Sequence, residues 1–297
     1  MPVLFDHAAI IGVGLIGSSL ARALKQHKLV KRITIADLNP AHNARALELG
    51  LGETATTDLA AGVSGADLTV ICTPIGVFES VARAIAPALK QGALLTDVGS
   101  VKQAVIDAVK PHVPPGVHFI PGHPIAGTEH SGPDSGFAEL FAGRYYLYTP
   151  LPGTDPAMAE KLAELWRRCG SKVEAMEPEH HDQVLAITSH LPHLIAYTIV
   201  GTATDLAGDL RQEVIKYSAS GFRDFTRIAA SDPVMWRDIF LNNREAVLDI
   251  MQRFSEDLTE LQKAIRKSDG QALFDLFSRT RAIRRGIFDA FRPRSYE

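Results

Sequence analysis

The stretch AAIIGVGLIGSSLARALK, residues 8–25, decides the fold class of this chain. An apolar run expected to form a strand leads into Gly12, and apolar residues with helical spacing follow Gly17. The glycines between them form a GxGxxG motif, in which Gly12 permits a tight turn, Gly14 lets the backbone approach a pyrophosphate, and Gly17 lets the helix pack closely. The stretch therefore predicts the dinucleotide-binding turn of an open, doubly wound sheet.

Two neighbouring features favour NAD as the dinucleotide. Leu15 and Ile16 lie in the glycine turn just before the expected helix, at whose start backbone N–H groups bind anions such as phosphates. Asp37 ends the next expected strand, about 20 residues after the last glycine, where a carboxylate accepts hydrogen bonds from the ribose hydroxyls. Its charge repels a 2′-phosphate, which favours NAD, whereas Arg45 leaves NADP open. The alternative is that these residues only form a tight turn and a helix cap.

Composition places the chain among soluble globular proteins. Its 297 residues suggest two domains, and 46% hydrophobic with 22% charged residues exclude a disordered or fibrous chain. The net charge of -3 excludes a polycation built for nucleic acid. Cys72 and Cys169 are too few for a disulfide framework, and no apolar run approaches the ~18 residues of a membrane span. Because the start of the chain also lacks signal-peptide features, a cytoplasmic protein without a membrane or nucleic-acid partner is expected.

The first part of the chain alternates between strand and helix patterns. Strands are expected at 8–13, 33–37, 68–72, 94–98 and 118–120, with 145–148 and 172–175 as later additions. Helical periodicity occupies 18–25, 40–49, 77–89 and 101–109. This alternation is typical of βα units, so we predict an α/β fold with an N-terminal Rossmann-like domain over residues 1–177.

After Pro178 the strand patterns stop. Long helical segments are expected at 179–206, with a bend at Pro192, and at 233–265 and 269–291. We predict a C-terminal all-α domain over residues 178–297. Because one small domain cannot bury so many apolar helix faces, a homodimer formed through these helices is expected.

Polar residues gather where three of the expected strands end. Cys72, Thr73 and Pro74 follow one strand, at the edge where ligands bind in open α/β sheets. They are expected either to line the adenosine side of the cofactor or to form a simple loop. The segments TDVGSVK (96–102) and GHPIAGTE (122–129) close two other strands, on the expected nicotinamide side.

His123 is the candidate catalytic base. A histidine oriented by a hydroxyl such as that of Ser100 can take the proton of a substrate alcohol while hydride leaves the same carbon. The alternative is a loop histidine with a backbone partner. With an unperturbed histidine pKa of about 6.5, activity is expected to fall below that pH.

The helical half contributes a second histidine cluster. Helical spacing places Ser189 and His193 on one face. His190 and His193 lack a cysteine or carboxylate that would complete a metal site, so no metal is expected. His180 and His181, near the start of the first long helix, are expected in solvent.

Two arginines one helical turn apart form a candidate anion site. Arg223 and Arg227 lie beside aromatic residues, and a guanidinium binds a carboxylate or phosphate bidentately. The alternative is an ordinary surface ion pair with Asp224.

Taken together, these segments resemble the prephenate and arogenate dehydrogenases of tyrosine biosynthesis, also called cyclohexadienyl dehydrogenases. The shared motifs occur in the family's order and cover nearly the whole chain; they are GVGLIGSSLA (12–21), DVGSVK (97–102), GHPIAGTEHSG (122–132), SHLPH (189–193) and GFRDFTRIAASDPVMWRDIF (221–240). The resemblance implies a Rossmann-like domain, a helical dimerisation domain, and oxidative decarboxylation of prephenate or arogenate with NAD or NADP.

The resemblance also implies roles for individual residues. His123 takes the proton of the substrate's ring hydroxyl, and Ser100 orients His123 or contacts that hydroxyl. Arg227 holds a substrate carboxylate, while Ser189 and His193 contact the substrate's side chain. The resemblance further implies that Glu129 forms a gate near the pocket entrance and that Asp224 holds this gate or Arg227 in place. It also implies that Trp236 reaches into the partner subunit's site.

Two other functions are compatible with a Rossmann domain followed by helices. A hydroxyacid or 6-phosphogluconate type of dehydrogenase uses a lysine of the helical domain, but Lys216 is the only lysine between Lys172 and Lys263 and lacks a convincing motif. A regulator that senses NAD without turnover is disfavoured by the candidate base and arginine fork. Prephenate carries a keto group, and arogenate an amino group, at the same side-chain carbon, and this is their only difference. The sequence therefore leaves open which of the two is the substrate.

Overall fold

The computed structural model describes residues 2–205, 213, 216–217 and 219–291. Contacts divide the chain into two units, Met1–Val247 and Leu248–Glu297, and each is described by itself. The first unit holds both β-sheets and all the residues predicted to form the site.

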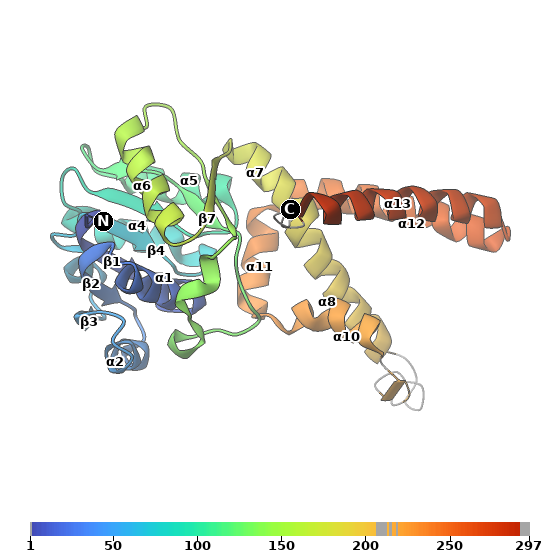
Figure 1. Ribbon diagram of the computed structural model, residues 1–297, viewed down its shortest axis with the longest axis horizontal. Helices are drawn as coiled ribbons and strands as arrows, with labels where there is room; N and C mark the ends of the chain where they lie inside the picture. Colours follow the sequence, from blue (N-terminus) through green and yellow to red (C-terminus); the bar gives the residue numbers. More distant parts are fainter. Residues whose placement is uncertain (1, 206–212, 214–215, 218, 292–297) are drawn as a thin grey trace, which may run out of the picture. The chain divides into compact units, whose positions relative to one another are not determined.

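The first unit is built on a six-stranded parallel sheet in the order β3-β2-β1-β4-β5-β6 (Figure 1). The strands are β1 (Phe5–Ile11), β2 (Val30–Ala36), β3 (Thr54–Thr56), β4 (Leu68–Ile71), β5 (Leu94–Asp97) and β6 (His118–Phe119). Ile10 is opposite both Ile35 and Val70, so the carboxyl ends of β1, β2 and β4 meet at one edge. This strand order is that of the dinucleotide-binding fold, in which ligands bind where the order reverses, beside β1 and β4. The predicted fold class is confirmed.

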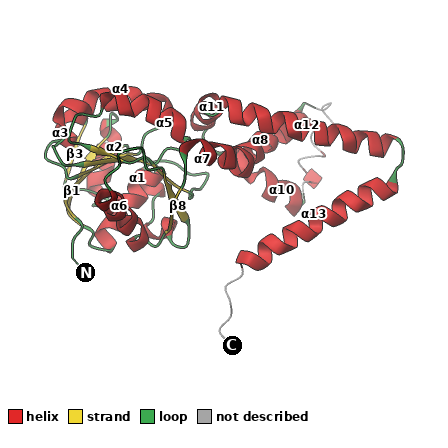
Figure 2. Ribbon diagram, turned by 90° about the horizontal axis from the view of Figure 1, so that it is seen from above, coloured by secondary structure: helices red, strands yellow, loops and turns green. Residues whose placement is uncertain are grey.

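Helices cover both faces of this sheet, as Figure 2 shows. Ala8 and Ile10 of β1 pack into the core under α1 and α6, whereas Ala9 and Ile11 pack into the core under α4. This alternation arises because successive strand residues point to opposite faces. The helices around the sheet are α1 (Leu15–Gln26), α2 (Pro40–Glu48), α3 (Leu59–Val63), α4 (Phe78–Ile85), α5 (Lys102–Val109) and α6 (Pro156–Arg168).

A second, three-stranded sheet carries the candidate base. It consists of β7 (Gly122–Pro124), β8 (Tyr145–Tyr148) and β9 (Lys172–Ala175), with β7 antiparallel and β9 parallel to β8. Tyr146 of β8 stacks on Trp166 of α6, with ring centroids 4.1 Å apart, and both side chains are fully buried. This packing joins the small sheet to the main core.

The chain then runs through α7 (Pro178–Leu185), the π-turn η6 (Ala186–His190) and α8 (Leu191–Thr204). Among the described residues, Pro178–Thr204 is the one helical stretch long and apolar enough, by length and composition, to cross a membrane. The stretch contains no uninterrupted apolar run of that length, because polar residues lie within it. Three of these, His181, Asp182 and His190, are buried within this unit.

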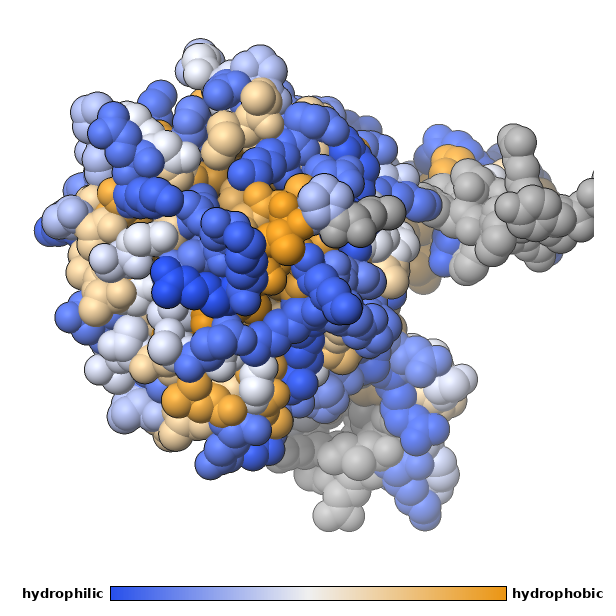
Figure 3. All heavy atoms as spheres, turned by 60° about the vertical axis from the view of Figure 1, so that its left-hand side comes forward, coloured by the Kyte–Doolittle hydropathy of each residue, from blue (hydrophilic) through white to orange (hydrophobic). Residues whose placement is uncertain are grey.

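The remaining helices complete both units. They are α10 (Ser220–Thr226), the 3-10 turn η7 (Arg227–Ala230), α11 (Pro233–Asn242), α12 (Arg244–Arg266) and α13 (Gly270–Phe291). Leu258 and Ile265 of α12 and Phe274, Phe277 and Ile283 of α13 are exposed in this chain. Figure 3 shows a mainly hydrophilic face of the molecule with hydrophobic residues in separate patches.

The predicted elements are confirmed with a few differences. β3 and β7 are not predicted, because one has three residues and the other contains glycine and proline, which disfavour strands. α1 begins at Leu15, three residues before the predicted start. The expected helix over 233–265 breaks at Asn243, whose buried amide donates to the Asp182 carbonyl and contacts His190 Nδ1. The part of the expected helix beyond residue 205 lies outside the described residues.

Candidate active site

The glycine turn has the shape that a dinucleotide requires. Gly12 has φ +87, and a Cβ there would lie 2.9 Å from the Cys72 carbonyl oxygen, so only glycine fits. A Cβ on Gly17 would overlap the Gly12 carbonyl. Gly14 has no atom within 4 Å of where its Cβ would be, which leaves the turn open on that side. Since no side chain caps α1, the N–H groups of its first turn, at Leu15 and Ile16, are available to a phosphate.

The Asp37 carboxylate lies beside this turn. Its Oδ2 accepts a hydrogen bond from Val13 N (3.0 Å), and its Oδ1 accepts one from Asn39 N (2.9 Å). Arg45, the residue that leaves NADP open, donates to both Asp134 and Glu48. Its guanidinium is thus already engaged by two carboxylates, an arrangement that favours NAD.

The residues after β4 close the other side of the turn. Cys72 N donates to the Ile11 carbonyl (2.7 Å), and the Thr73 methyl group lies next to Gly12. The Thr73 hydroxyl is buried and has no partner among the described residues, which suits a ligand contact. Pro74, which follows, is exposed. Burial raises the pKa of the Cys72 thiol, so Cys72 lines the turn as a neutral group. The sequence-predicted NAD residues are therefore brought together and fit the cofactor.

A buried ion pair joins the end of β5, the start of β7 and the start of α5. Asp97 and Lys102 are both 0% exposed and form a salt bridge. Asp97 also accepts hydrogen bonds from Gly99 N (2.7 Å) and Gly122 N (3.0 Å), and Lys102 Nζ donates to the Gly122 carbonyl (2.6 Å). This network holds the residues next to Ser100 and His123. Sequence reasoning included both charged residues in a polar strand end but gave them no role.

His123 is buried, with 8% of its surface exposed, and its partner is a second histidine. Its Nδ1 lies 2.9 Å from Nε2 of His181, whose Nδ1 lies 2.8 Å from Oδ1 of Asp182. The prediction that His181 is in solvent is wrong, because α7 packs against α5 and buries His181 completely. Ser100 is half-buried and has no hydrogen bond to His123 in the described structure, where the ring partner of His123 is His181. A contact of Ser100 with the substrate hydroxyl stays a prediction.

The surroundings of His123 hold it neutral. Burial lowers the pKa of His123 well below 6.5, and the neighbouring His181, Lys102 and His190 lower it further. The expectation of an unperturbed pKa is therefore wrong. A neutral imidazole is the form that accepts a proton.

The π-turn and α8 contribute the second histidine cluster. His193 Nδ1 donates to the Ser189 carbonyl (2.9 Å), and its ring stacks on Trp236 with centroids 3.6 Å apart. Trp236 is 5% exposed and packs with Val101, the residue after Ser100. The Trp236 ring lies against His193 of its own chain, and a contact of Trp236 with the partner subunit's site stays a prediction.

An ion pair joins the predicted carboxylate-binding arginine to the predicted gate. Arg227 of η7 donates to Glu129 of the loop after β7 (2.8 Å). Arg227 keeps 58% of its side chain exposed, and Glu129 keeps 26%. Asp224 and Arg223 are exposed, and in the described part of the chain neither forms a bond with Glu129 or Arg227. The tie predicted for Asp224 is thus made by Glu129 instead.

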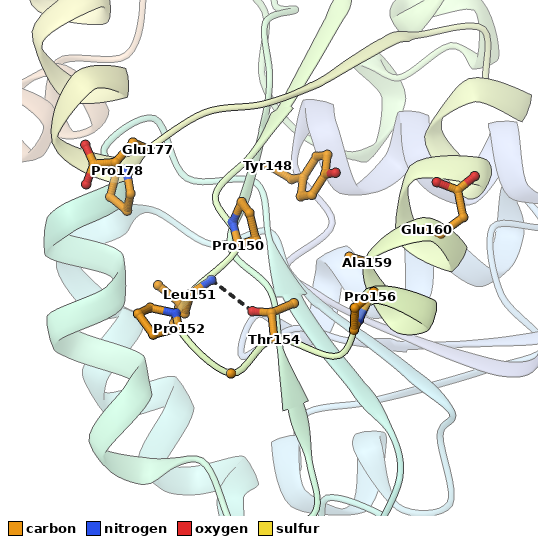
Figure 4. Close-up of a pocket in the computed structure, with 11 residues that line it drawn as sticks. Tyr148, Pro150, Leu151, Pro152, Thr154, Pro156, Ala159, Glu160, Glu177 and Pro178 are labelled. Carbon is orange, nitrogen blue, oxygen red and sulfur yellow. Dashed lines mark hydrogen bonds between the residues drawn. The ribbon is translucent and has the colours of Figure 1, made fainter.

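A cleft of about 680 Å³ lies elsewhere, between the loop after β8, the start of α6 and the start of α7 (Figure 4). It is lined by Tyr148, by prolines 150, 152, 156 and 178, and by Glu160 and Glu177. None of the predicted site residues lines it. The described residues also contain no group of three metal-ligating side chains.

Comparison with known proteins gives matches over most of the chain. A family profile described as "Prephenate dehydrogenase, nucleotide-binding domain" matches residues 20–175, and one described as "Prephenate dehydrogenase, dimerization domain" matches residues 177–279. The chain is 42% identical to a cyclohexadienyl dehydrogenase of Zymomonas mobilis over 280 residues, which cover 94% of this chain and 95% of the relative. It is 34% identical to a prephenate dehydrogenase of Bacillus subtilis over 286 residues, which cover 95% and 76%.

Solved structures give the same result. A prephenate dehydrogenase from Aquifex aeolicus, in complex with hydroxyphenyl propionate and NAD+, is similar with a TM-score of 0.88 and 33% identity, covering 95% of this chain and 98% of that one. A Synechocystis arogenate dehydrogenase is similar with a TM-score of 0.79 and 28% identity, covering 95% and 99%.

Proposed function

The chain belongs to the prephenate dehydrogenase family, and from this premise we propose that it oxidises and decarboxylates prephenate, arogenate or both in tyrosine biosynthesis, with NAD as hydride acceptor. The observation that carries the site assignment is the buried, neutral His123, tied through Gly122 to the end of β5 in a dinucleotide-binding sheet. That position brings a proton acceptor to the edge where the cofactor binds.

The reaction needs one proton acceptor and firm binding of a dicarboxylate. NAD, when bound by the glycine turn and Asp37, supplies the acceptor for the hydride that leaves the alcohol carbon of the substrate. His123 takes the hydroxyl proton at Nε2, its free ring nitrogen. The bond to the ring carboxylate then breaks, carbon dioxide leaves, and the electron pair of that bond completes the aromatic ring. Because aromatisation drives the reaction forward, the protein mainly binds, orients and accepts the proton.

Substrate binding is assigned to the residues around Arg227. A substrate carboxylate replaces Glu129 on the Arg227 guanidinium, so Glu129 acts as the gate. Ser189 and His193, held on one face of the helix by their mutual hydrogen bond and by Trp236, contact the substrate's side chain. Asp224 stays a candidate near this site.

Arg227→Ala is expected to raise the KM for the ring substrate roughly 10- to 100-fold while changing kcat much less. The reason is that a hydrogen bond to a charged group contributes about 1.5–3 kcal/mol to binding. Steady-state kinetics at saturating NAD measures both constants. Arg223→Ala, one helical turn away, is the matched control and should leave KM within a factor of about 2. A raised KM in the Arg223 variant with no change in the Arg227 variant would move the carboxylate site to Arg223.

The pH profile of kcat/KM is expected to have its acid limb below pH 6.5. Only neutral His123 accepts a proton, and burial with its positive neighbours lowers its pKa well below 6.5. An acid limb at pH 6.5 or above would contradict this assignment.

Circular dichroism over the same pH range separates catalysis from unfolding. Burial lowers the pKa of His190 to about 4 and also lowers that of His181. The unfolded chain, with ordinary histidines, therefore binds protons first as the pH falls through 6.5, and the folded protein loses stability between that pH and the lowered pKa values. Rates at each pH should be divided by the fraction that is folded.

We further propose a cytoplasmic homodimer formed through the helical part of the chain, with a domain boundary near residue 177. Support comes from the profile for residues 177–279, whose description names dimerisation, and from the exposed apolar residues of α12 and α13. Burying such residues between two copies stabilises an obligate dimer. Analytical ultracentrifugation tests this proposal, with Phe274→Asp and Phe277→Asp expected to yield monomers.

The proposed function is tested by mixing purified protein with each ring substrate and each cofactor, and by following the absorbance of reduced nicotinamide. Turnover of prephenate or arogenate with NAD is expected, and the ratio of kcat/KM values gives the preference for each. The engaged state of Arg45 leads us to expect weaker use of NADP. Folded protein that binds NAD and turns over neither substrate would overturn the proposal and favour a hydroxyacid dehydrogenase or an NAD sensor.

A further inference from the structure

A chain of three buried side chains lies behind the proposed base. His123 Nδ1 is 2.9 Å from His181 Nε2, and His181 Nδ1 is 2.8 Å from Asp182 Oδ1. His181 is 0% exposed and Asp182 is 5% exposed. The residues come from two elements far apart in sequence, β7 and α7, so the contact arises only in the folded chain.

The Asp182 carboxylate is fixed as an acceptor. Its Oδ1 accepts a hydrogen bond from Lys102 N (2.7 Å), and its Oδ2 accepts one from Gln103 N (2.9 Å). These are the first N–H groups of α5, whose N-cap residue Val101 makes no side-chain cap. Asp182 of α7 therefore caps the N-terminus of α5, and both of its carboxylate oxygens accept backbone hydrogen bonds there.

The fixed carboxylate determines the position of each proton in the chain. Asp182 only accepts, so the hydrogen between it and His181 is on His181 Nδ1. Neutral His181 then has a lone pair on Nε2, so the hydrogen between the two rings is on His123 Nδ1. His123 is left with a lone pair on Nε2, the form that a base requires.

We propose that His181 and Asp182 are positioning residues for the base: they hold His123 in the tautomer with a free Nε2 and stabilise the positive charge that arrives there. This inference rests on the proposed role of His123. When the substrate O–H bond breaks and the Nε2–H bond forms, the Nδ1–H of His123 is polarised towards His181, whose own Nδ1–H points at the carboxylate. The imidazolium charge is thus spread towards Asp182.

The charged groups around His123 and His181 leave Asp182 as the group that stabilises a positive charge on His123. Lys102 of α5 and His190 of η6 face the histidines and disfavour added positive charge. Asp97 of β5 is already paired with Lys102. In the described part of the chain, Asp182 is the carboxylate hydrogen-bonded to the histidine pair.

Three variants test the pair in the full-length protein. His181→Phe fills the space but offers no acceptor to His123 Nδ1, so we expect kcat to fall on the order of 100-fold or more with little change in KM. His181→Gln places an amide oxygen near the position of Nε2, so we expect it to restore kcat to within about tenfold of the wild type. Asp182→Asn should lower kcat and shift the acid limb of kcat/KM to lower pH, because the carboxylate no longer stabilises the imidazolium.

His7→Phe is the control for the loss of a buried histidine. His7 is 4% exposed, bonds to Thr34 and Arg32, and lies near the start of β1, away from the carboxyl edge of the sheet. It should lower stability without changing kcat per folded enzyme.

A measurement without turnover separates this inference from the proposed function. Ring ¹⁵N shifts of histidine-labelled protein distinguish the two neutral tautomers, and the His123→Asn spectrum identifies the His123 signals. We expect the Nδ1–H tautomer in the wild type and its loss in the Asp182→Asn variant. An Nε2–H tautomer in the wild type, or equal losses of kcat in the phenylalanine and glutamine variants, would overturn the inference even if the enzyme turns over prephenate. If no ring substrate reacts while the Nδ1–H tautomer is present, the proposed function fails and the positioning of His123 stands.

Discussion

Replacing His123 by asparagine is expected to lower kcat about 1000-fold while leaving the affinity for NAD unchanged. General acid–base catalysis contributes roughly 10²- to 10⁴-fold, and His123 is the one proposed acceptor of the hydroxyl proton. Asparagine preserves a polar side chain of similar size but accepts no proton at neutral pH. Steady-state kinetics gives kcat, and the quenching of protein fluorescence on titration with NAD gives its Kd.

The NAD titration is also the control in this experiment. The glycine turn and Asp37 belong to the ends of β1 and β2, whereas His123 belongs to the second sheet, so the variant should bind NAD as the wild type does. A kcat within a factor of a few of the wild type would show that another group takes the proton. A large loss of NAD affinity would place His123 in the cofactor site instead.

Lys102→Met is expected to lower the free energy of unfolding by about 3–5 kcal/mol, since it leaves the fully buried Asp97 carboxylate without its cation. Burial lowers the pKa of the Lys102 ammonium, but Asp97 opposes this shift and keeps the pair together. The variant also removes the hydrogen bond from Lys102 Nζ to the Gly122 carbonyl. Because Gly122 directly precedes His123, kcat should fall as well. Denaturant titration, followed by circular dichroism, measures the change in stability.

Lys90→Met provides the matched control for this substitution. Lys90 also forms a salt bridge with an aspartate, Asp67, but its side chain is 50% exposed. Exposed ion pairs contribute at most about 1 kcal/mol, so this variant should lose little stability. Equal losses in the two variants would contradict a special contribution of the buried pair. The double variant Asp97→Asn with Lys102→Met should recover part of the loss, because it removes the unpaired charge.

Much of the fold follows from patterns that are local in the chain. The run from Ala8 to Lys25 predicts strand, turn and helix because a positive φ at Gly12 and a close approach at Gly17 are demands of the turn itself. Asp37 is recognised by its spacing from that turn, and its carboxylate does lie against Val13. The short β3 and the glycine- and proline-containing β7 escape prediction, since their pairing partners and not their own residues make them strands.

The residue types of the site are also predictable, but their partners are not. Histidine, aspartate and lysine are most often found in solvent, so a sequence pattern assigns His181 to the surface and gives Lys102 no role. Their burial depends on α7 packing against α5, which brings Asp182 to Lys102 across 80 positions in sequence. The same holds for Arg227 and Glu129, which are separated by 98 positions.

The sequence by itself therefore determined the dinucleotide turn, the alternation of strands and helices in the first part of the chain, and the candidate base. Tertiary structure alone decided that the candidate base is buried with a lowered pKa, which histidine lies beside it, and which carboxylate pairs with Arg227. The physical reason is the distance along the chain between the residues that determine each property. Backbone conformation at a turn is governed by neighbours in the chain, whereas the pKa of a side chain and its hydrogen-bond partners are governed by burial and charge contributed by distant elements.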